Sequence, residues 1–116
     1  IVSPGIPVDR YNTVEAKRAS AAGYAEHEGL YTDPAIAEGY RRYILKKKNT
    51  FLREMVERDL VGILKIYMEN GDVNADNFKN FMELCQLSKA TQCVAYLLAW
   101  KDENLPDGWQ EREWDL

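Results

Sequence analysis

Four short apolar stripes between residues 51 and 100 constrain the fold of this chain most. Their members recur at i, i+3 and i+4, and in the longer stripes at i+7, which is the spacing of a helix with one buried face. The stripes are Leu52, Met55 and Val56; Leu60, Ile63, Leu64, Tyr67 and Met68; Phe78, Phe81, Met82 and Cys85; and Cys93, Tyr96, Leu97 and Trp100. Asn70-Gly71-Asp72 separates the second stripe from the third, and residues 86–89 separate the third from the fourth. We therefore predict two helix pairs in succession.

The two predicted pairs resemble each other. Ile63-Leu64 aligns with Val94-Ala95 at an offset of 94 − 63 = 31 residues, close to the ~33-residue period of ankyrin repeats. Residues 63–74 resemble the second helix and exit turn of an ankyrin repeat, whereas the Thr-Pro-Leu-His opening of that repeat is absent. The likeness covers half of the motif and predicts an ankyrin-like stack.

Two further helices precede the stripes. Residues 14–26 are rich in alanine, which favours a helix and lets a neighbouring backbone approach closely. Asp33-Pro34 starts the next helix, since aspartate caps free N–H groups and proline suits the first turn. Asn74 and Ser88 are expected to cap the third and fourth stripes in the same way.

We predict an all-α fold of about six helices in antiparallel pairs, stacked as an ankyrin-like or solenoid-like array with extended termini. The helical domain spans residues 1–104, with an extended lead-in over 1–12 because Pro4, Gly5 and Pro7 disfavour a helix there. An acidic tail follows over residues 105–116.

Length and composition describe one globular domain of 116 residues, and its net charge of −4 argues against nucleic acid as a partner. No apolar run reaches the ~20 residues of a membrane span. The chain begins with Ile1 and lacks the form of a signal peptide, so we expect a piece of a longer protein. Cys85 and Cys93 lie on inward stripes, where buried thiols are favoured over a disulfide, and unpaired thiols favour the cytoplasm.

A basic stretch on the second helix is the first candidate binding site. Ile36, Tyr40, Tyr43 and Ile44 form its apolar face, and Arg41, Arg42, Lys46, Lys47 and Lys48 are expected to form a basic face opposite. Five cations on one helix can engage phosphates, but no aromatic or glycine pattern accompanies them. A solvated face, or a match for the acidic tail, is favoured.

The tail from Asp102 holds the second candidate site, Trp109 and Trp114. Six acidic residues surround them against one basic residue, Arg112. A large exposed aromatic side chain requires an explanation. Either Trp109 folds back on the helices, or Trp109 or Trp114 docks on another domain or chain.

Few residues suggest catalysis or metal binding. His27 is the single histidine and lies between Glu26 and Glu28, so a solvated role is favoured over that of a general base. Asp72, Asn74 and Asp76 have the spacing of a calcium loop, and Glu83 fits its last ligand, but Asn77 replaces the required glycine. We interpret that segment as a turn with a helix cap and predict no metal, cofactor or catalytic residue.

Several short motifs together resemble a known arrangement. They are Pro4-Gly5-Ile6-Pro7, Ala21-Ala22-Gly23-Tyr24, Tyr40-Arg41-Arg42-Tyr43-Ile44 and Ala95-Tyr96-Leu97-Leu98-Ala99-Trp100-Lys101. The arrangement is the ankyrin-like helical segment of bacterial proteins, mostly of gut Firmicutes, that also carry leucine-rich repeats. The resemblance covers about residues 1–101. It implies a C-terminal helical module with an interaction role and no assigned chemistry.

The function that these observations favour is a non-enzymatic protein–protein interaction module, monomeric or weakly dimeric. Its partner is a protein or a neighbouring domain of the same chain. Arg41, Arg42, Lys46, Lys47, Trp109 and Trp114 are the predicted binding residues. Two alternatives stay open, a structural cap or spacer for neighbouring repeats and, less favoured, an enzyme of unknown class.

Overall fold

The structure, a computed structural model, describes residues 2–105. Six α-helices account for most of them, with no strand in that range, which confirms the all-α prediction. The helices are α1 (Val14–Glu26), α2 (Pro34–Lys46), α3 (Lys48–Arg58), α4 (Val61–Glu69), α5 (Phe78–Leu87) and α6 (Thr91–Asn104). Two 3-10 turns, η1 (Val8–Arg10) and η2 (Glu28–Leu30), flank α1.

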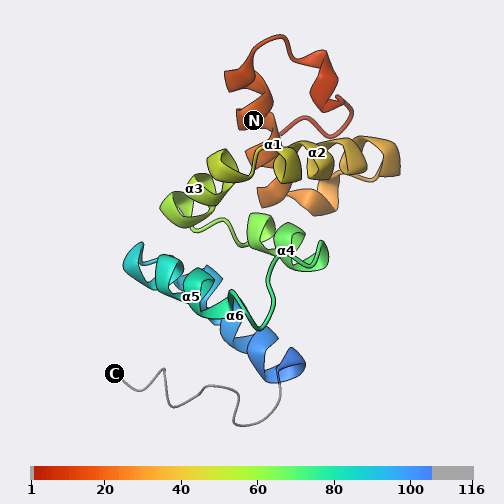
Figure 1. The fold of residues 1–116 in the computed structure, drawn as a ribbon. Helices are drawn as coiled ribbons and strands as arrows, with labels where there is room; N and C mark the ends of the chain where they lie inside the picture. Colours follow the sequence, from red (N-terminus) through yellow and green to blue (C-terminus); the bar gives the residue numbers. More distant parts are fainter. Residues whose placement is uncertain (1, 106–116) are drawn as a thin grey trace.

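Helix α4 lies at the centre of an elongated molecule of 48 × 25 × 20 Å. It contacts α1, α2 and α3 on one side and α6 on the other (Figure 1). Together with the end of α3, it links the N-terminal helices to the α5–α6 pair. This position explains why five of its nine residues are buried.

Helix α1 begins as its sequence predicts and packs closely because it is built from small residues. Thr13 caps it, with Oγ1 accepting from the Ala16 N–H at 3.0 Å. Ala21, Ala22 and Ala25 are all at most 5% exposed. A β-carbon placed on Gly62 of α4 would lie 2.0 Å from the Ala25 carbonyl oxygen, so the two backbones nearly touch.

Helix α2 also begins as predicted. Asp33 accepts from the Ala35 N–H at 2.9 Å, and Pro34 occupies the first turn. Tyr40 and Ile44 are fully buried. A single residue, Lys47, separates α2 from α3, which starts at Lys48 rather than near Phe51, because residues 48–50 are helical.

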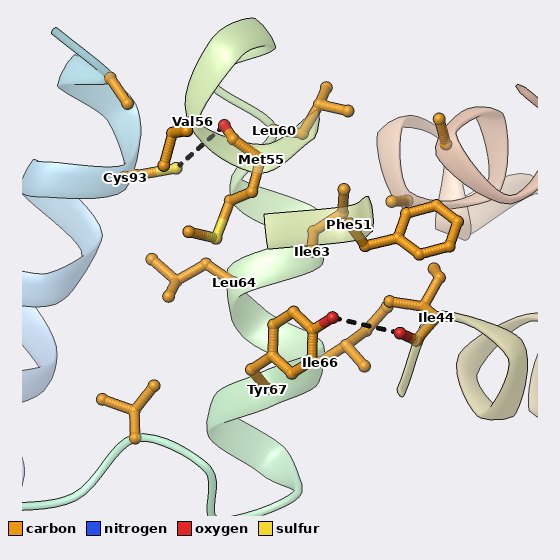
Figure 2. Packing of buried hydrophobic residues seen from close by; sticks show 14 of the residues in the cluster. Ile44, Phe51, Met55, Val56, Leu60, Ile63, Leu64, Ile66, Tyr67 and Cys93 are labelled. Atoms are coloured by element: carbon orange, nitrogen blue, oxygen red, sulfur yellow. Dashed lines mark hydrogen bonds between the residues drawn. The ribbon is translucent and has the colours of Figure 1, made fainter. Parts of the chain in front are cut away.

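The apolar stripes form one continuous core. Figure 2 shows Met55 and Val56 of α3 and Leu64 of α4 packed toward Cys93 of α6. Every stripe residue is buried except Leu52, Met68, Tyr96 and Trp100, which are partly buried against the core. The predicted inward faces are therefore confirmed.

Two consecutive hairpins, α3–α4 and α5–α6, have matching turns. The Leu60 N–H donates to the Met55 carbonyl at 2.9 Å, and the Ala90 N–H donates to the Cys85 carbonyl at the same distance. Asp59 and Lys89, the residues before these donors, both have positive φ. The turns are therefore 30 residues apart (89 − 59), one residue fewer than the offset of 31 expected from the stripes.

The predicted cap of the last helix is wrong. Ser88 ends α5, and Lys89 and Ala90 lie between it and the first residue of α6. The acceptor is instead Asp59, whose carboxylate takes the N–H groups of Gln92 and Cys93 at 2.9 and 3.0 Å. A residue in one hairpin thus caps a helix of the next.

The lead-in is not simply extended. Ile6 donates its N–H to the Ser3 carbonyl at 3.1 Å, and η1 follows with Val8 buried against the core. Pro7 precedes η1 as its N-cap, so it does not interrupt the 3-10 hydrogen bond from Tyr11 to Val8. Local turns that need few donors are found within the lead-in that was expected to be extended.

Candidate interaction surface

The basic side chains of α2 do not share one face as predicted. Arg42 and Lys46, one turn apart, line a surface hollow of about 280 Å³ between α2 and η1. Arg41 points to the other side of α2 and lines a different hollow of about 240 Å³ beside α4. Lys47 is exposed at the junction of α2 and α3. The structure therefore brings together two of the four predicted cations.

The hollow that contains Arg42 and Lys46 is called the α2 hollow below. Its lining is completed by Val8, Asp9, Gly39 and Tyr43. Val8 is 5% exposed and Tyr43 is partly buried, so the floor is apolar. Gly39 adds no side chain to it. The site therefore offers two cations and one carboxylate at the rim of an apolar depression.

The two arginines form only weak, exposed ion pairs with an acidic neighbour. Glu38 lies 3.7 Å from Arg41 and 3.5 Å from Arg42, one helical turn away on α2. Exposed pairs of this kind contribute only ~0–1 kcal/mol, so a partner's carboxylate can replace Glu38. Lys46 and Lys47 form no ion pair within residues 2–105.

Three buried tyrosines hold the lead-in against α2 and so shape the α2 hollow. The rings of Tyr24, Tyr31 and Tyr40 lie 5.0–5.5 Å apart, one pair stacked and two edge to face. Tyr40 donates its hydroxyl to the Ile6 carbonyl at 2.7 Å, and the Tyr31 hydroxyl accepts from the Ser3 N–H at 3.2 Å.

The ionisation of Tyr40 supports this role. Burial raises the pKa of Tyr40 to about 12, so its hydroxyl keeps the proton that it donates to Ile6. A hydroxyl hydrogen bond at 2.7 Å is of ordinary strength for the type. The wall of the hollow formed by the lead-in is therefore a fixed part of the fold.

An ion-pair network between α1 and α3 was not foreseen. Glu54 of α3 pairs with Arg18 of α1 and, at 3.5 Å, with Arg58, which also reaches Glu26 at 3.1 Å. Only the Glu54–Arg58 spacing of four residues could have indicated any of it. A hollow of about 380 Å³ lies beside this network, lined also by Asn49, Thr50, Arg53 and Glu57. Because Arg18 and Glu54 there pair with each other, we assign the network to structure rather than binding.

His27 has no arrangement that favours catalysis. Its Nε2 lies 3.7 Å from Glu26, an exposed sequence neighbour that is already paired with Arg58. The imidazole is about half exposed. The geometry matches a solvated histidine at a helix end.

The segment with calcium-loop spacing uses its polar groups on itself. Asn74 Oδ1 accepts from the N–H groups of Asp76 and Asn77, and Asn70 donates to the Asp72 carboxylate at 3.1 Å. Gly71, at φ +82°, makes the turn after α4. Across residues 2–105, no group of three or more His, Cys, Asp or Glu side chains is placed to hold a metal ion.

Both cysteines are free thiols buried between α5 and α6. A hydrogen bond with Cys85 and burial both raise the pKa of Cys93, so its thiol stays protonated at neutral pH. Cys93 Sγ lies 4.0 Å from the Met55 carbonyl oxygen (Figure 2). A protonated, fully buried thiol such as that of Cys93 is a poor nucleophile, whereas the hydrogen bond with Cys93 lowers the pKa of Cys85.

The other predicted binding residues, Trp109 and Trp114, lie outside the described residues, as does the part of the tail over residues 106–116. In the part of the chain that the structure describes, no helix is both long and apolar enough to cross a bilayer.

Comparisons of the chain with protein-family models, with curated proteins and with solved structures find no match. The resemblance to ankyrin-like segments of bacterial multidomain proteins therefore stays an expectation from sequence motifs.

Proposed function

We propose that this chain is a non-enzymatic protein-interaction module, an ankyrin-like stack of helix pairs that binds a protein or neighbouring domain through the α2 hollow. The observation that carries the proposal is that Arg42 and Lys46 line the same hollow, which also has an apolar floor. Cations at the rim select acidic groups, and the floor accepts an apolar side chain. The partner class is an acidic segment that contains at least one aromatic or aliphatic residue.

The surroundings of the hollow support a binding role. The lead-in wall is held by Tyr31 and Tyr40, and the floor residue Val8 belongs to the core. A hollow that exists before the partner arrives needs little ordering on binding, which favours affinity. Lys47 and Lys48 stand exposed beside the hollow and extend the positive potential that steers an acidic partner.

The matching turns support the stacked architecture. Asp59 and Lys89 occupy equivalent positions 30 residues apart (89 − 59), with the same hydrogen bond after each. Stacks of helix pairs are extended, present side chains in rows and commonly serve as binding scaffolds. The length of 48 Å against widths of 25 and 20 Å fits such a stack.

The test is a binding titration with defined peptides. Fluorescence anisotropy measures the affinity of the protein for synthetic peptides that differ in net charge and in the presence of an aromatic residue. We expect acidic peptides with an aromatic residue to bind best, and binding to weaken with salt. Arg42→Glu with Lys46→Glu should weaken it by about tenfold or more, which is ~1.4 kcal/mol or more.

The control is Arg53→Glu with Lys89→Glu, which makes the same charge change at exposed positions away from the α2 hollow. It should leave peptide affinity within about twofold, while both double variants keep the melting temperature of the wild type, because exposed charges contribute little to stability. Equal weakening by the two double variants, or no preference for acidic peptides, would contradict the proposal.

A specific observation favours the second candidate, a structural cap or spacer. The α5–α6 hairpin exposes three leucines, Leu84 at 38%, Leu87 at 84% and Leu98 at 48%. Exposed leucines at the end of a stack are typical of a surface that a further unit covers. Under this alternative, a longer chain would bury these leucines, and their replacement by polar residues would leave peptide binding at the α2 hollow unchanged.

A further inference from the structure

We propose that the α2 hollow takes the acidic, tryptophan-bearing segment 107–115 of a second copy of this chain, so that copies associate head to tail. The inference rests on the proposed function and names its partner. Three observations carry it: the chemistry of the hollow, the composition of the segment, and the place in the fold where the segment begins.

The segment and the hollow are chemically complementary. Residues 107–115 contain four carboxylates (Asp107, Glu111, Glu113 and Asp115), the single cation Arg112, and two tryptophans. Carboxylates form their strongest hydrogen bonds with guanidinium and ammonium groups such as those of Arg42 and Lys46. A guanidinium also stacks on an indole ring.

The remaining groups of the hollow fit the same segment. The apolar floor formed by Val8 and Tyr43 offers an indole contact area away from water. Asp9, the one carboxylate in the lining, is an acceptor for a cation, and Arg112 is the one cation of the segment. A purely acidic partner would leave Asp9 unmatched.

The position of the α6 terminus favours a second copy over the same one. The described chain ends at Leu105, after α6, whereas the α2 hollow lies beyond α4 at the other end of the molecule (Figure 1). Packed helices are separated by ~8–10 Å, so two layers of packing lie between α6 and α2. Trp109 is four residues past Leu105 and reaches at most ~14 Å. Trp109 therefore cannot enter the hollow of its own copy. Trp114, nine residues past Leu105, spans at most ~32 Å and can reach that hollow, but only with Trp109 left outside, so a second copy is needed to seat the whole segment.

The two surfaces of this contact are different, so the contact is heterologous. Each copy would use its hollow for one neighbour and its segment for another, which extends an assembly rather than closing a symmetric dimer. The net charge of −4 opposes association at low salt, while the local attraction between hollow and segment weakens as salt rises. Association is therefore expected to be weak and concentration-dependent.

Sedimentation velocity of the full chain tests the inference. We expect the weight-average sedimentation coefficient to rise with concentration up to about 1 mM, the range of weak association. Two variants should each stay monomeric: the hollow variant, Arg42→Glu with Lys46→Glu, and the segment variant, Trp109→Ala with Trp114→Ala. Mixed together, they should form a 1:1 complex that does not grow, because one intact hollow meets one intact segment.

Three results would overturn the inference: a monomeric full chain at that concentration, association that survives in either variant, or variants that fail to complement each other. A contact within one copy would appear as hollow-dependent tryptophan quenching that does not change with concentration, and this too would overturn it. If the full chain stays monomeric but the hollow still binds acidic peptides in the titration above, the inference fails while the proposed function stands. If the full chain stays monomeric and the hollow also fails to bind acidic peptides, both the inference and the proposed function are rejected.

Discussion

At the scale of single residues, Asp59 and Lys89 share a backbone conformation, but only the side chain of Asp59 also caps another helix. Both adopt left-handed φ, 54° and 58°, at the end of a helix. This conformation disfavours residues that have a β-carbon. Asp59 compensates because its carboxylate caps α6 through Gln92 and Cys93. Lys89 has no acceptor to offer at the equivalent position.

Glycine at these two positions should therefore have different effects on stability. Lys89→Gly relieves the backbone and should raise the free energy of unfolding by up to ~1 kcal/mol. Asp59→Gly gives the same relief but removes the cap, a loss of ~0.5–2 kcal/mol, so it should be neutral to destabilising. Urea denaturation of both variants checks this. A gain in stability for Asp59→Gly as large as that for Lys89→Gly would show that the cap contributes nothing.

The Asp59 cap also predicts a dependence on pH. Burial alone raises the pKa of Asp59, but the N–H groups of Gln92 and Cys93 outweigh it and hold the pKa below its ordinary value. A carboxyl whose pKa falls on folding stabilises the folded state above its unfolded pKa, ~3.9, and loses that contribution as pH drops through the folded pKa.

The stability difference between the wild type and Asp59→Asn should thus be constant from neutral pH down to about pH 5 and shrink below about pH 4. Denaturant titrations at several pH values measure it. Asparagine suits the comparison because it tolerates left-handed φ and retains one acceptor oxygen. A difference that grows toward acid would show that the sign of the shift is wrong.

At the scale of elements, the crossing of α1 and α4 depends on the absence of one side chain. A β-carbon at Gly62 would lie 2.0 Å from the Ala25 carbonyl oxygen and 2.8 Å from its carbonyl carbon. Backbone atoms cannot move aside as a flexible side chain can, so the two helices would have to separate. Ile63 and Leu64, which follow Gly62 on α4, are fully buried, so the separation would loosen their packing as well.

Gly62→Ala should therefore destabilise the protein by about 1–3 kcal/mol, the usual range for overpacking, despite the better helix propensity of alanine. Gly39→Ala is the matched control. It lies in α2, where the nearest atom to the added carbon, Val8 Cγ1, is 4.0 Å away, so it should stabilise by up to ~1 kcal/mol. Thermal denaturation of the pair tests this. Equal shifts in melting temperature would show that the close approach of Gly62 to Ala25 does not determine the effect of an added β-carbon.

At the scale of the whole molecule, the core runs through all six helices, but its end at α5–α6 is not fully covered by residues 2–105. Leu97 is fully buried, whereas Leu87 is 84% exposed on the same hairpin. Leu97→Ala should lower the free energy of unfolding by ~2–5 kcal/mol. Leu87→Gln should change it by less than ~0.5 kcal/mol while raising solubility. Calorimetry and a precipitation assay check both, and a large loss for Leu87→Gln would show that this leucine is covered.

The sequence alone determined most of the helices. The spacing of apolar residues, the Thr13 and Asp33 caps and the left-handed Gly71 are local features, so residues within a few positions specify them. The inward faces followed from the same periodicity. The start of α3 was missed because Lys48, Asn49 and Thr50 carry no apolar signal of their own.

Tertiary structure decided the rest, because contacts between residues distant in the chain leave no periodic trace. Asp59 caps a helix more than 30 positions away, Gly62 meets Ala25, and Arg18 pairs with Glu54. The same reason applies to the α2 hollow. The prediction of one basic face overlooked helix periodicity, which turns Arg41 away from Arg42 and Lys46. The hollow that Arg42 and Lys46 line exists only because η1 packs against α2, and no local pattern in the sequence indicates that contact.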